Sequence, residues 1–369
     1  MLRAGKLMIS PGESNSDMRY ASQVATPDDI LWFSAGAICG LIASKLEFDR
    51  VREECRRGVA VFTEEEFGGP GYVDIVKNIA ARYHLEGFSV PKDFPLGLAD
   101  KLRSTGLIIE PAEEGFFPER EFKQDFEVEK ITSTLRAAEA GCRRAFDVLR
   151  EADIDSQKRL VWNGNILTSE ILRSEIDCTM LKLGCLATGT ICAGGAQGAQ
   201  PHNAGSGALY ADKPIVMDIF PRSSITGYWG DLTRTVVKGR ASDVVKKAFD
   251  AVLEARELAK SMLKIGACPA EIHSSAAQAM EKRGFYTGVN DSGNFGFFHG
   301  LGHGVGLDIH ENPRLSLRNS ASLKGGEVVT IEPGLYYPEW GGIRLEDMVY
   351  LDMAGKAHCL TEIEDFLVI

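Results

Sequence analysis

Short apolar runs and amphipathic stretches alternate in the first third of the chain. Residues 7–10, 30–33 and 59–62 are apolar runs of strand length, whereas residues 48–57 and 72–83 repeat apolar positions at helical spacing. Strands interleaved with helices predict an α/β domain, and this part of the sequence gathers no cluster of metal-ligand or nucleophilic residue types.

A connection rich in prolines and acidic residues follows. Segment 110–120 contains two prolines and several glutamates, which is typical of an exposed linker. We therefore predict two domains, residues 1–122 and 123–369, and a chain of 369 residues is long enough for both.

Four amphipathic helices are predicted in the second domain. The first spans 125–152, and the side chains that recur on one face at three-to-four spacing are Ile131, Leu135, Ala138, Cys142, Phe146 and Leu149. The second begins at Thr168 and Ser169, whose hydroxyls can cap it, and the others span 242–263 and 269–283. The order of two helices, strands, two helices and strands indicates an internal duplication. Its helices would wrap around an antiparallel sheet in an α+β fold.

Composition and charge narrow the function classes. Apolar residues make up 44% of the chain and the formal net charge is −11, which argues against binding to nucleic acid or to an anionic membrane surface. We see no signal peptide and no apolar run long enough to span a bilayer. The eight cysteines include no CxxC pair, so we expect them to be reduced and buried in a cytoplasmic protein.

Two aspartates interrupt apolar strands. Asp218 lies inside the apolar run 214–220, where a carboxylate is costly unless it has a partner. Asp231 follows within 227–237, after glycines and aromatic residues that can turn the chain. The two strands can therefore pair antiparallel, with both carboxylates on one face.

A second group of ligand-type residues lies near the C-terminal end. His299, His303 and His310 occur within one glycine-rich segment, although the whole chain has only seven histidines. Glu332 and Glu346 then interrupt two further strand-like runs, joined by a turn that contains proline, glycine and tryptophan. A single acid in a strand is more often an edge or turn residue, but the repeated plan favours a metal site.

Four carboxylates and one histidine form a hard, oxygen-rich donor set. Such a set suits Mn²⁺ best, with Co²⁺, Fe²⁺ or Zn²⁺ as alternatives. Four carboxylates are many for one ion and natural for two ions about 3.5–4 Å apart. Two such ions would activate a water molecule and polarise a scissile carbonyl group, which predicts a two-metal hydrolase.

Five motifs contain these residues: VMDIF, GYWGDLTRT, HGLGHGVGLDIHENP, TIEPGLYY and GGIRLEDM. They resemble the motifs of the pita-bread metallopeptidases, peptidase family M24, which includes methionine aminopeptidase, prolidase and aminopeptidase P. The resemblance implies a pita-bread catalytic domain over residues 123–369, with helices around an antiparallel sheet. It also implies a smaller creatinase-like α/β domain over residues 1–122, which favours the prolidase and aminopeptidase P branch because methionine aminopeptidases lack that domain.

The resemblance also implies a metal-ligand set: Asp218, Asp231, His303, Glu332 and Glu346. Asp218 would bind one ion, and Asp231 and Glu346 would bridge both. His303 and Glu332 would hold the other ion, and Glu332 would also shuttle the proton of the attacking water.

Four more residues receive roles from the same resemblance. His310 would hydrogen-bond the substrate carbonyl, and His299 would take part in proton transfer and contact the substrate. His202 would line the pocket. Arg344 would steady the site or meet a substrate carboxylate.

The implied activity is hydrolysis of the bond between an N-terminal residue and proline in small peptides. An Xaa-Pro dipeptidase is the first expectation, with Arg344 as one candidate to bind the C-terminal carboxylate, and an Xaa-Pro aminopeptidase acting on longer peptides is the alternative. A non-peptidase such as creatinase, which has lost the ligands, and a docking protein both fit less well, because all five ligand positions are present. The relatives' usual assembly implies a homodimer.

Overall fold

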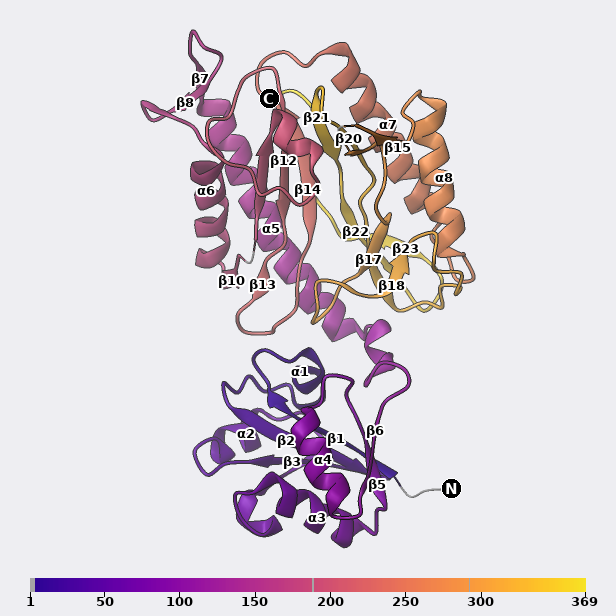
Figure 1. Ribbon diagram of the computed structural model, residues 1–369. Coiled ribbons are helices and arrows are strands. Elements are labelled where there is room, and N and C mark those ends of the chain that lie inside the picture. The colour runs from indigo at the N-terminus through magenta and orange to yellow at the C-terminus, as the bar shows by residue number, and fades with distance from the viewer. Residues whose placement is uncertain (1–3, 188, 292) are drawn as a thin grey trace. The chain divides into compact units, whose positions relative to one another are not determined.

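The computed structural model describes residues 4–187, 189–291 and 293–369, and the chain forms two compact units, Met1–Arg120 and Glu121–Ile369 (Figure 1). Each unit has its own buried apolar clusters.

The first unit is built on a six-stranded mixed sheet. Its strands are β1 (Ala4–Pro11), β2 (Asp29–Ala35), β3 (Ile38–Ala43), β4 (Val59–Thr63), β5 (Gly87–Val90) and β6 (Ile108–Pro111). The spatial order is β4-β3-β2-β1-β5-β6. The pairs β1–β2 and β2–β3 are antiparallel, and the outer pairs are parallel.

Alternating side chains on these strands supply an apolar cluster on each face of the sheet. Its helices are α1 (Ser16–Ser22), α2 (Phe48–Glu54), α3 (Tyr72–Tyr83) and α4 (Leu96–Ser104). Leu7 and Phe33 pack with residues of α3 and α4, whereas Met8 and Trp32 pack with residues of α1 and α2. The predicted α/β character of this part is therefore confirmed, although β3, β5, β6, α1 and α4 were not predicted.

Two pairs of helices flank the strands of the second unit (Figure 1). The helices are α5 (Asp125–Glu151), α6 (Ser169–Lys182), α7 (Asp243–Met262) and α8 (Pro269–Lys282). The predicted apolar face of α5 is buried throughout, and the Thr168 hydroxyl caps α6 by accepting a hydrogen bond from the Ile171 amide. Helix α5 packs on α6 and α7 packs on α8, in agreement with the predicted order of elements.

The strands of this unit form two main antiparallel sheets, one of three strands (β11-β12-β14) and one of five (β18-β17-β19-β22-β23). Their strands are β11 (Ile191–Gly194), β12 (Pro214–Ile219), β14 (Leu232–Val237), β17 (Gly302–Gly304), β18 (Glu311–Leu315), β19 (Glu327–Ile331), β22 (Asp347–Leu351) and β23 (Ala357–Cys359). Shorter pieces complete the unit: β7 (Asp153–Ile154), β8 (Leu160–Trp162), β9 (Asn165–Ile166), β10 (Cys185–Leu186), β13 (Arg222–Ser223), β15 (Gly288–Asn290), β16 (Gly293–Phe295), β20 (Gly334–Tyr337) and β21 (Gly341–Arg344).

Smaller features of the chain can also be described. The glycine-rich run 194–207 contains a 3₁₀ helix over Gly195–Ala199. The cysteines are free thiols, but Cys178 and Cys359 are exposed, so the expectation that all are buried was wrong. Within the described residues, no helix combines the length and apolar character needed to cross a membrane.

Candidate metal centre

The first pair of acids lies on one face of the β12–β14 pair. Asp218 on β12 is opposite Thr233 on β14, and Asp231 is two residues before Thr233. Because side chains alternate along a strand, Asp218, Thr233 and Asp231 point to the same side. Asp231 is buried, whereas Asp218 is half-buried. The predicted antiparallel arrangement of these two acids is therefore present.

The second pair of acids lies at matching breaks between strands. Strands β19 and β22 pair antiparallel, with Ile331 opposite Asp347, and the β20–β21 hairpin continues in the same register. Glu332 and Glu346 lie between these two strand pairs, where the regular strand pairing is interrupted, and the common register puts them opposite each other. Both carboxylates line the same cavity.

His303 joins the two pairs from strand β17. Its Nε2 atom lies 3.2 Å from Glu332 Oε1 and 3.6 Å from Asp231 Oδ2. Ligand atoms of Asp231, His303 and Glu346 all lie within 4.8 Å of one another. The Nδ1 atom is 3.2 Å from the Gly304 carbonyl oxygen, which can only accept, so Nδ1 carries a hydrogen and Nε2 is the nitrogen that faces the acids.

Glycines hold β17 close to its neighbours. A Cβ atom on Gly302 would lie 1.9 Å from the Thr330 carbonyl oxygen, and one on Gly304 would lie 2.1 Å from that of Asn312. Neither contact is possible with a side chain. The glycine-rich segment therefore places His303 against β19, the strand that leads into Glu332.

The charges of this cluster are strongly coupled. Burial and the neighbouring carboxylates raise the pKa of both Asp231 and Glu346 well above the usual values. Burial would also raise the pKa of Glu332, but the hydrogen bond with His303 lowers it to about 2. Among the described residues, few cationic side chains face the four acids of this cluster. Divalent cations would balance their negative charge, so the donor set fits such ions.

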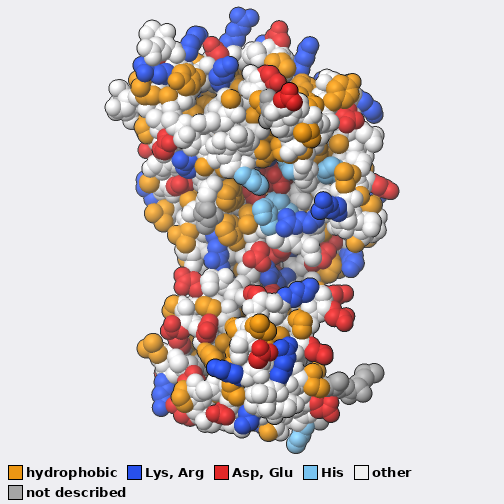
Figure 2. Space-filling model, viewed as in Figure 1, with side chains coloured by type: hydrophobic (Ala, Val, Ile, Leu, Met, Phe, Trp, Pro, Cys, Tyr) orange, Lys and Arg blue, Asp and Glu red, His pale blue; other side chains and the backbone are white. Residues whose placement is uncertain are grey.

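All nine residues selected from the sequence line one cavity of about 980 Å³. They are His202, Asp218, Asp231, His299, His303, His310, Glu332, Arg344 and Glu346. Figure 2 shows histidine and acidic side chains gathered around a hollow on this unit. His202 and His310 are exposed, whereas the acids lie deeper, with Asp218 and Glu332 only partly buried.

His310 approaches the metal-ligand cluster from the open side of the cavity. Its ring centroid lies 4.3 Å from that of His303, with the two planes nearly perpendicular. Although the His310 side chain is exposed, the protein atoms around it displace part of its water. This partial desolvation and the nearby His303 lower the pKa of His310 to about 4, so the ring is neutral at pH 7. A neutral imidazole can donate one hydrogen bond into the cavity.

A chain of polar contacts supports the cluster from behind. Arg344 donates to Asp218 Oδ2 at 2.7 Å and to the Tyr336 hydroxyl at 2.9 Å. The Tyr336 oxygen lies 2.9 Å from His299 Nε2, and His299 Nδ1 lies 2.7 Å from the Gly300 carbonyl oxygen. Nδ1 therefore carries the hydrogen, and the Tyr336 hydroxyl donates to Nε2.

Sequence reasoning missed the polar part played by Tyr336 and Thr233. Tyr336 received no role from the sequence, yet its hydroxyl joins Arg344 to His299. The Thr233 hydroxyl accepts from Arg344 Nε at 3.2 Å and donates to Glu346 Oε2 at 2.8 Å. The position of Thr233, two residues after Asp231 on the same strand face, was a signal that could have revealed it.

Comparison with known proteins places this geometry in a family. Residues 129–352 match the sequence pattern of metallopeptidase family M24. The chain belongs to this family. Membership in M24 implies that divalent metal ions bind, and the cluster of Asp231, His303 and Glu346 is a candidate site for them.

Individual relatives cover different shares of the chain. The M24 chain is 38% identical to an Xaa-Pro dipeptidase from Pyrococcus furiosus over 176 residues, which is 47% of each protein, so the match spans about half the length of that relative. Prolidase from Pyrococcus horikoshii has a TM-score of 0.80 and 24% identity, covering 99% of this chain and 95% of that one. X-Pro aminopeptidase from Thermotoga maritima has a TM-score of 0.81 and 24% identity, covering 99% and 97%. These structural likenesses confirm the expected pita-bread fold.

Proposed function

We propose that the protein is a two-metal peptidase that hydrolyses the bond between an N-terminal residue and proline, as an Xaa-Pro dipeptidase. The observation that carries this proposal is the convergence of four carboxylates and His303 on one cavity of an M24 chain. The names of the relatives from Pyrococcus furiosus and Pyrococcus horikoshii support the substrate class.

In this proposal Asp218, Asp231, His303, Glu332 and Glu346 would hold two divalent ions, most suitably Mn²⁺. The ions, when bound, supply Lewis-acid chemistry that activates water and polarises a carbonyl group. The Nε2 atom of His303 faces Glu332 and Asp231, where a ligand nitrogen would have to lie. Arg344 holds Asp218 and, through Thr233, orients Glu346.

The remaining pocket residues act on the peptide and its protons. The Glu332 carboxylate lines the cavity beside His303, where it would take the proton of the attacking water and pass it to the leaving nitrogen. His310 and His202, both exposed in the same cavity, would hydrogen-bond the carbonyl groups of the peptide. Both ring nitrogens of His299 have partners in the protein, so its substrate contact would be made by the ring edge and its part in proton transfer would pass through Tyr336.

A dipeptidase needs a cation for the C-terminal carboxylate. Arg344 was one candidate, but it is 3% exposed and donates to Asp218, Tyr336 and Thr233. Arg314 on β18 lines the same cavity with an exposed side chain. We therefore propose Arg314 as the cation that meets the carboxylate of an Xaa-Pro dipeptide.

The proposal is tested by hydrolysis of Ala-Pro beside Ala-Pro-Ala, with chelator-treated protein before and after addition of Mn²⁺. Metal-dependent cleavage of Ala-Pro alone is the expected result, and Arg314→Met should raise KM for Ala-Pro more than it lowers kcat. Preference for Ala-Pro-Ala would instead favour an Xaa-Pro aminopeptidase, the activity of the structurally similar protein from Thermotoga maritima. Two bound ions without cleavage of either peptide would refute both.

We also propose that the two compact units are the creatinase-like and catalytic domains expected from the sequence, and that the protein is a cytoplasmic homodimer. Light scattering during gel filtration measures the assembly directly. A mass of one 40.2 kDa chain would refute the dimer.

A further inference from the structure

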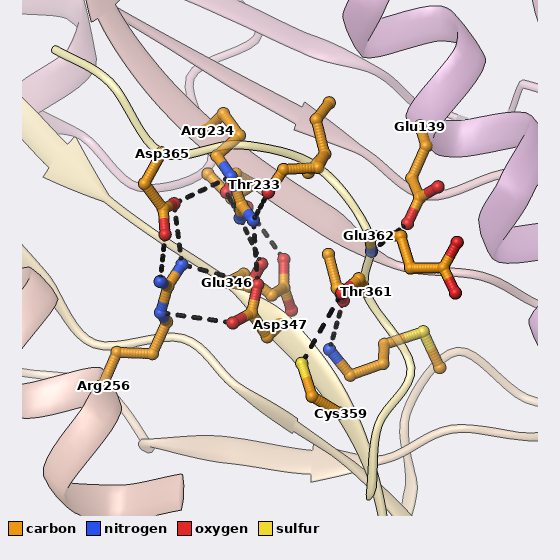
Figure 3. Close-up of polar contacts among 12 residues, drawn as sticks. Glu139, Thr233, Arg234, Arg256, Glu346, Asp347, Cys359, Thr361, Glu362 and Asp365 are labelled. Atoms are coloured by element: carbon orange, nitrogen blue, oxygen red, sulfur yellow. Dashed lines mark hydrogen bonds and ion pairs between the residues drawn. The ribbon is translucent and has the colours of Figure 1, made fainter.

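Arg234 lies on the reverse side of the strand that carries the metal-facing residues. Its neighbour Thr233 points to Glu346 in the cavity, and successive side chains of a strand point to opposite faces. Arg234 is 2% exposed, and it does not line the cavity. Figure 3 shows its guanidinium group at the centre of a network that reaches the strand of Glu346 and the C-terminal segment.

Both Nη nitrogens of this guanidinium group donate hydrogen bonds, whereas Nε is buried without one among the described residues. Nη1 donates to the carbonyl oxygens of Thr233 at 2.9 Å and Glu346 at 2.6 Å. Nη2 donates to Asp347 Oδ1 at 2.9 Å and to the Ile363 carbonyl oxygen at 3.2 Å. Nε forms an ion pair with Asp365 Oδ1 at 3.1 Å. A planar group with five donors can hold this many acceptors in fixed directions.

The two carbonyl contacts concern the metal centre directly. Thr233 and Glu346 lie on neighbouring segments, and the Glu346 amide also donates to the Thr233 carbonyl oxygen at 3.0 Å. On the cavity side, the Thr233 hydroxyl donates to the Glu346 carboxylate. Arg234 therefore links the backbones of Thr233 and Glu346 on the side of the strand that faces away from the cavity. This link helps to set the distance between Glu346 and the strand of Asp231.

The rest of the network fixes Arg234 itself. Arg256 on α7 contacts both Asp347 and Asp365, so the two acids are shared by two buried guanidinium groups. The C-terminal segment is held in place separately, because the Thr361 hydroxyl accepts from the Met348 amide at 2.9 Å. Within the described residues, the hydrogen bonds of Arg256 go to Glu257, Asp347 and Asp365, and none goes to the carbonyl oxygen of Thr233 or Glu346.

We propose that Arg234 is a positioning residue of the metal centre, and that the C-terminal segment 361–365 keeps it in place. The inference rests on the proposed two-metal function. The guanidinium group fixes the backbone of Glu346 against that of Thr233, so that the Glu346 carboxylate keeps its place beside the strand of Asp231, where both acids would hold metal. Outer contacts of this kind change metal affinity by about 10- to 100-fold when they are removed.

Arg234→Met and Arg256→Met form a matched pair for the test. Both variants remove a buried cation from Asp347 and Asp365, but only Arg234→Met removes the bonds to the Thr233 and Glu346 carbonyl oxygens. The metal-free proteins are titrated with Mn²⁺ by calorimetry, and their unfolding in guanidinium chloride is measured in parallel. We expect similar losses of stability, with Mn²⁺ affinity weakened about 10- to 100-fold in Arg234→Met and less than about 3-fold in Arg256→Met.

Equal Mn²⁺ affinities in the two variants would overturn the inference while leaving the metal centre in place. An unsubstituted protein that binds no Mn²⁺ would instead overturn the proposed function. Arg234→Lys keeps the buried positive charge, and serves if the methionine variants do not fold. A lysine ammonium group cannot span both carbonyl oxygens and both acids, so this variant should fold yet bind Mn²⁺ weakly, and Mn²⁺ affinity equal to that of the unsubstituted protein would overturn the inference.

Discussion

Replacement of Asp347 by asparagine should destabilise the second unit strongly. Asp347 is 3% exposed and accepts ion pairs from Arg234 at 2.9 Å, Arg256 at 3.3 Å and Lys260 at 2.8 Å. Removal of its charge leaves two buried guanidinium groups that share the partly exposed Asp365. Breaking a buried pair by removing one partner costs about 3–5 kcal/mol.

The size of this loss can be converted into a melting temperature. One kcal/mol shifts the midpoint of a domain of about 150–250 residues by about 2–4 °C, so Asp347→Asn should lower it by about 6–20 °C. The assay is guanidinium unfolding and thermal melting of the metal-free protein, followed by tryptophan fluorescence, since Trp162, Trp229 and Trp340 all lie in this unit. Asp147→Asn is the control, because its pair with Arg150 is exposed and should contribute less than about 1 kcal/mol.

The same variant has a predictable pH dependence. Burial would raise the pKa of Asp347, but Arg234, Arg256 and Lys260 together lower it below the usual value. The folded-state pKa is then below the unfolded-state pKa, so this stabilisation is complete above about pH 4 and is lost as the pH falls further. The difference between the variant and the unsubstituted protein should stay constant between about pH 6 and 8. A loss below about 1 kcal/mol at pH 7 would refute the reasoning.

Three further perturbations follow from the site. Gly230→Ala would place a Cβ atom 2.5 Å from the Leu135 amide nitrogen of α5. We therefore expect the free energy of unfolding to fall by about 1–3 kcal/mol and the Mn²⁺ affinity to weaken, and unchanged values of both would contradict that contact. Tyr336→Phe removes the hydroxyl between Arg344 and His299. This change should lower kcat about tenfold or more without loss of bound metal, and full activity would show that these contacts are dispensable. Metal removal should destabilise the protein, and Mn²⁺ at one hundred times its Kd should restore about 2.7 kcal/mol per site; a melting temperature independent of Mn²⁺ would argue against binding to the folded state alone.

The sequence was most informative where a charged residue interrupts an apolar strand or where apolar positions repeat regularly over many residues. Asp218 stands in an apolar strand, and the number of residues before Asp231 allows a return strand, so a shared face followed from spacing alone. The long helix α5 was predictable because its apolar positions repeat over many turns. Short elements such as β3 and α4 were missed because a few residues carry too little periodic signal to separate strand, helix and loop.

The support behind the site could not be predicted in the same way. Arg234 and Asp347 follow metal-facing residues directly, and in the sequence they resemble ordinary charged residues of exposed strand faces. Their partners, Arg256 and Asp365, come from elements far away along the chain, and no local pattern indicates that these four charges meet. Likewise, nothing local distinguishes the buried hydroxyl of Tyr336 from the neighbouring Tyr337.

The duplicated order of helices and strands has a consequence for assembly of the site. Asp218 and Asp231 belong to the half that follows α5 and α6, whereas His303, Glu332 and Glu346 belong to the half that follows α7 and α8. Neither half can contain a complete donor set, and the Thr233–Glu346 backbone hydrogen bond joins them across more than one hundred residues of sequence. Tight metal binding therefore requires the two halves to be packed together, so a measurement of Mn²⁺ affinity also measures whether this unit has folded. Fragments divided between β14 and α7 should each fail to bind Mn²⁺ tightly and should recover that ability only when mixed.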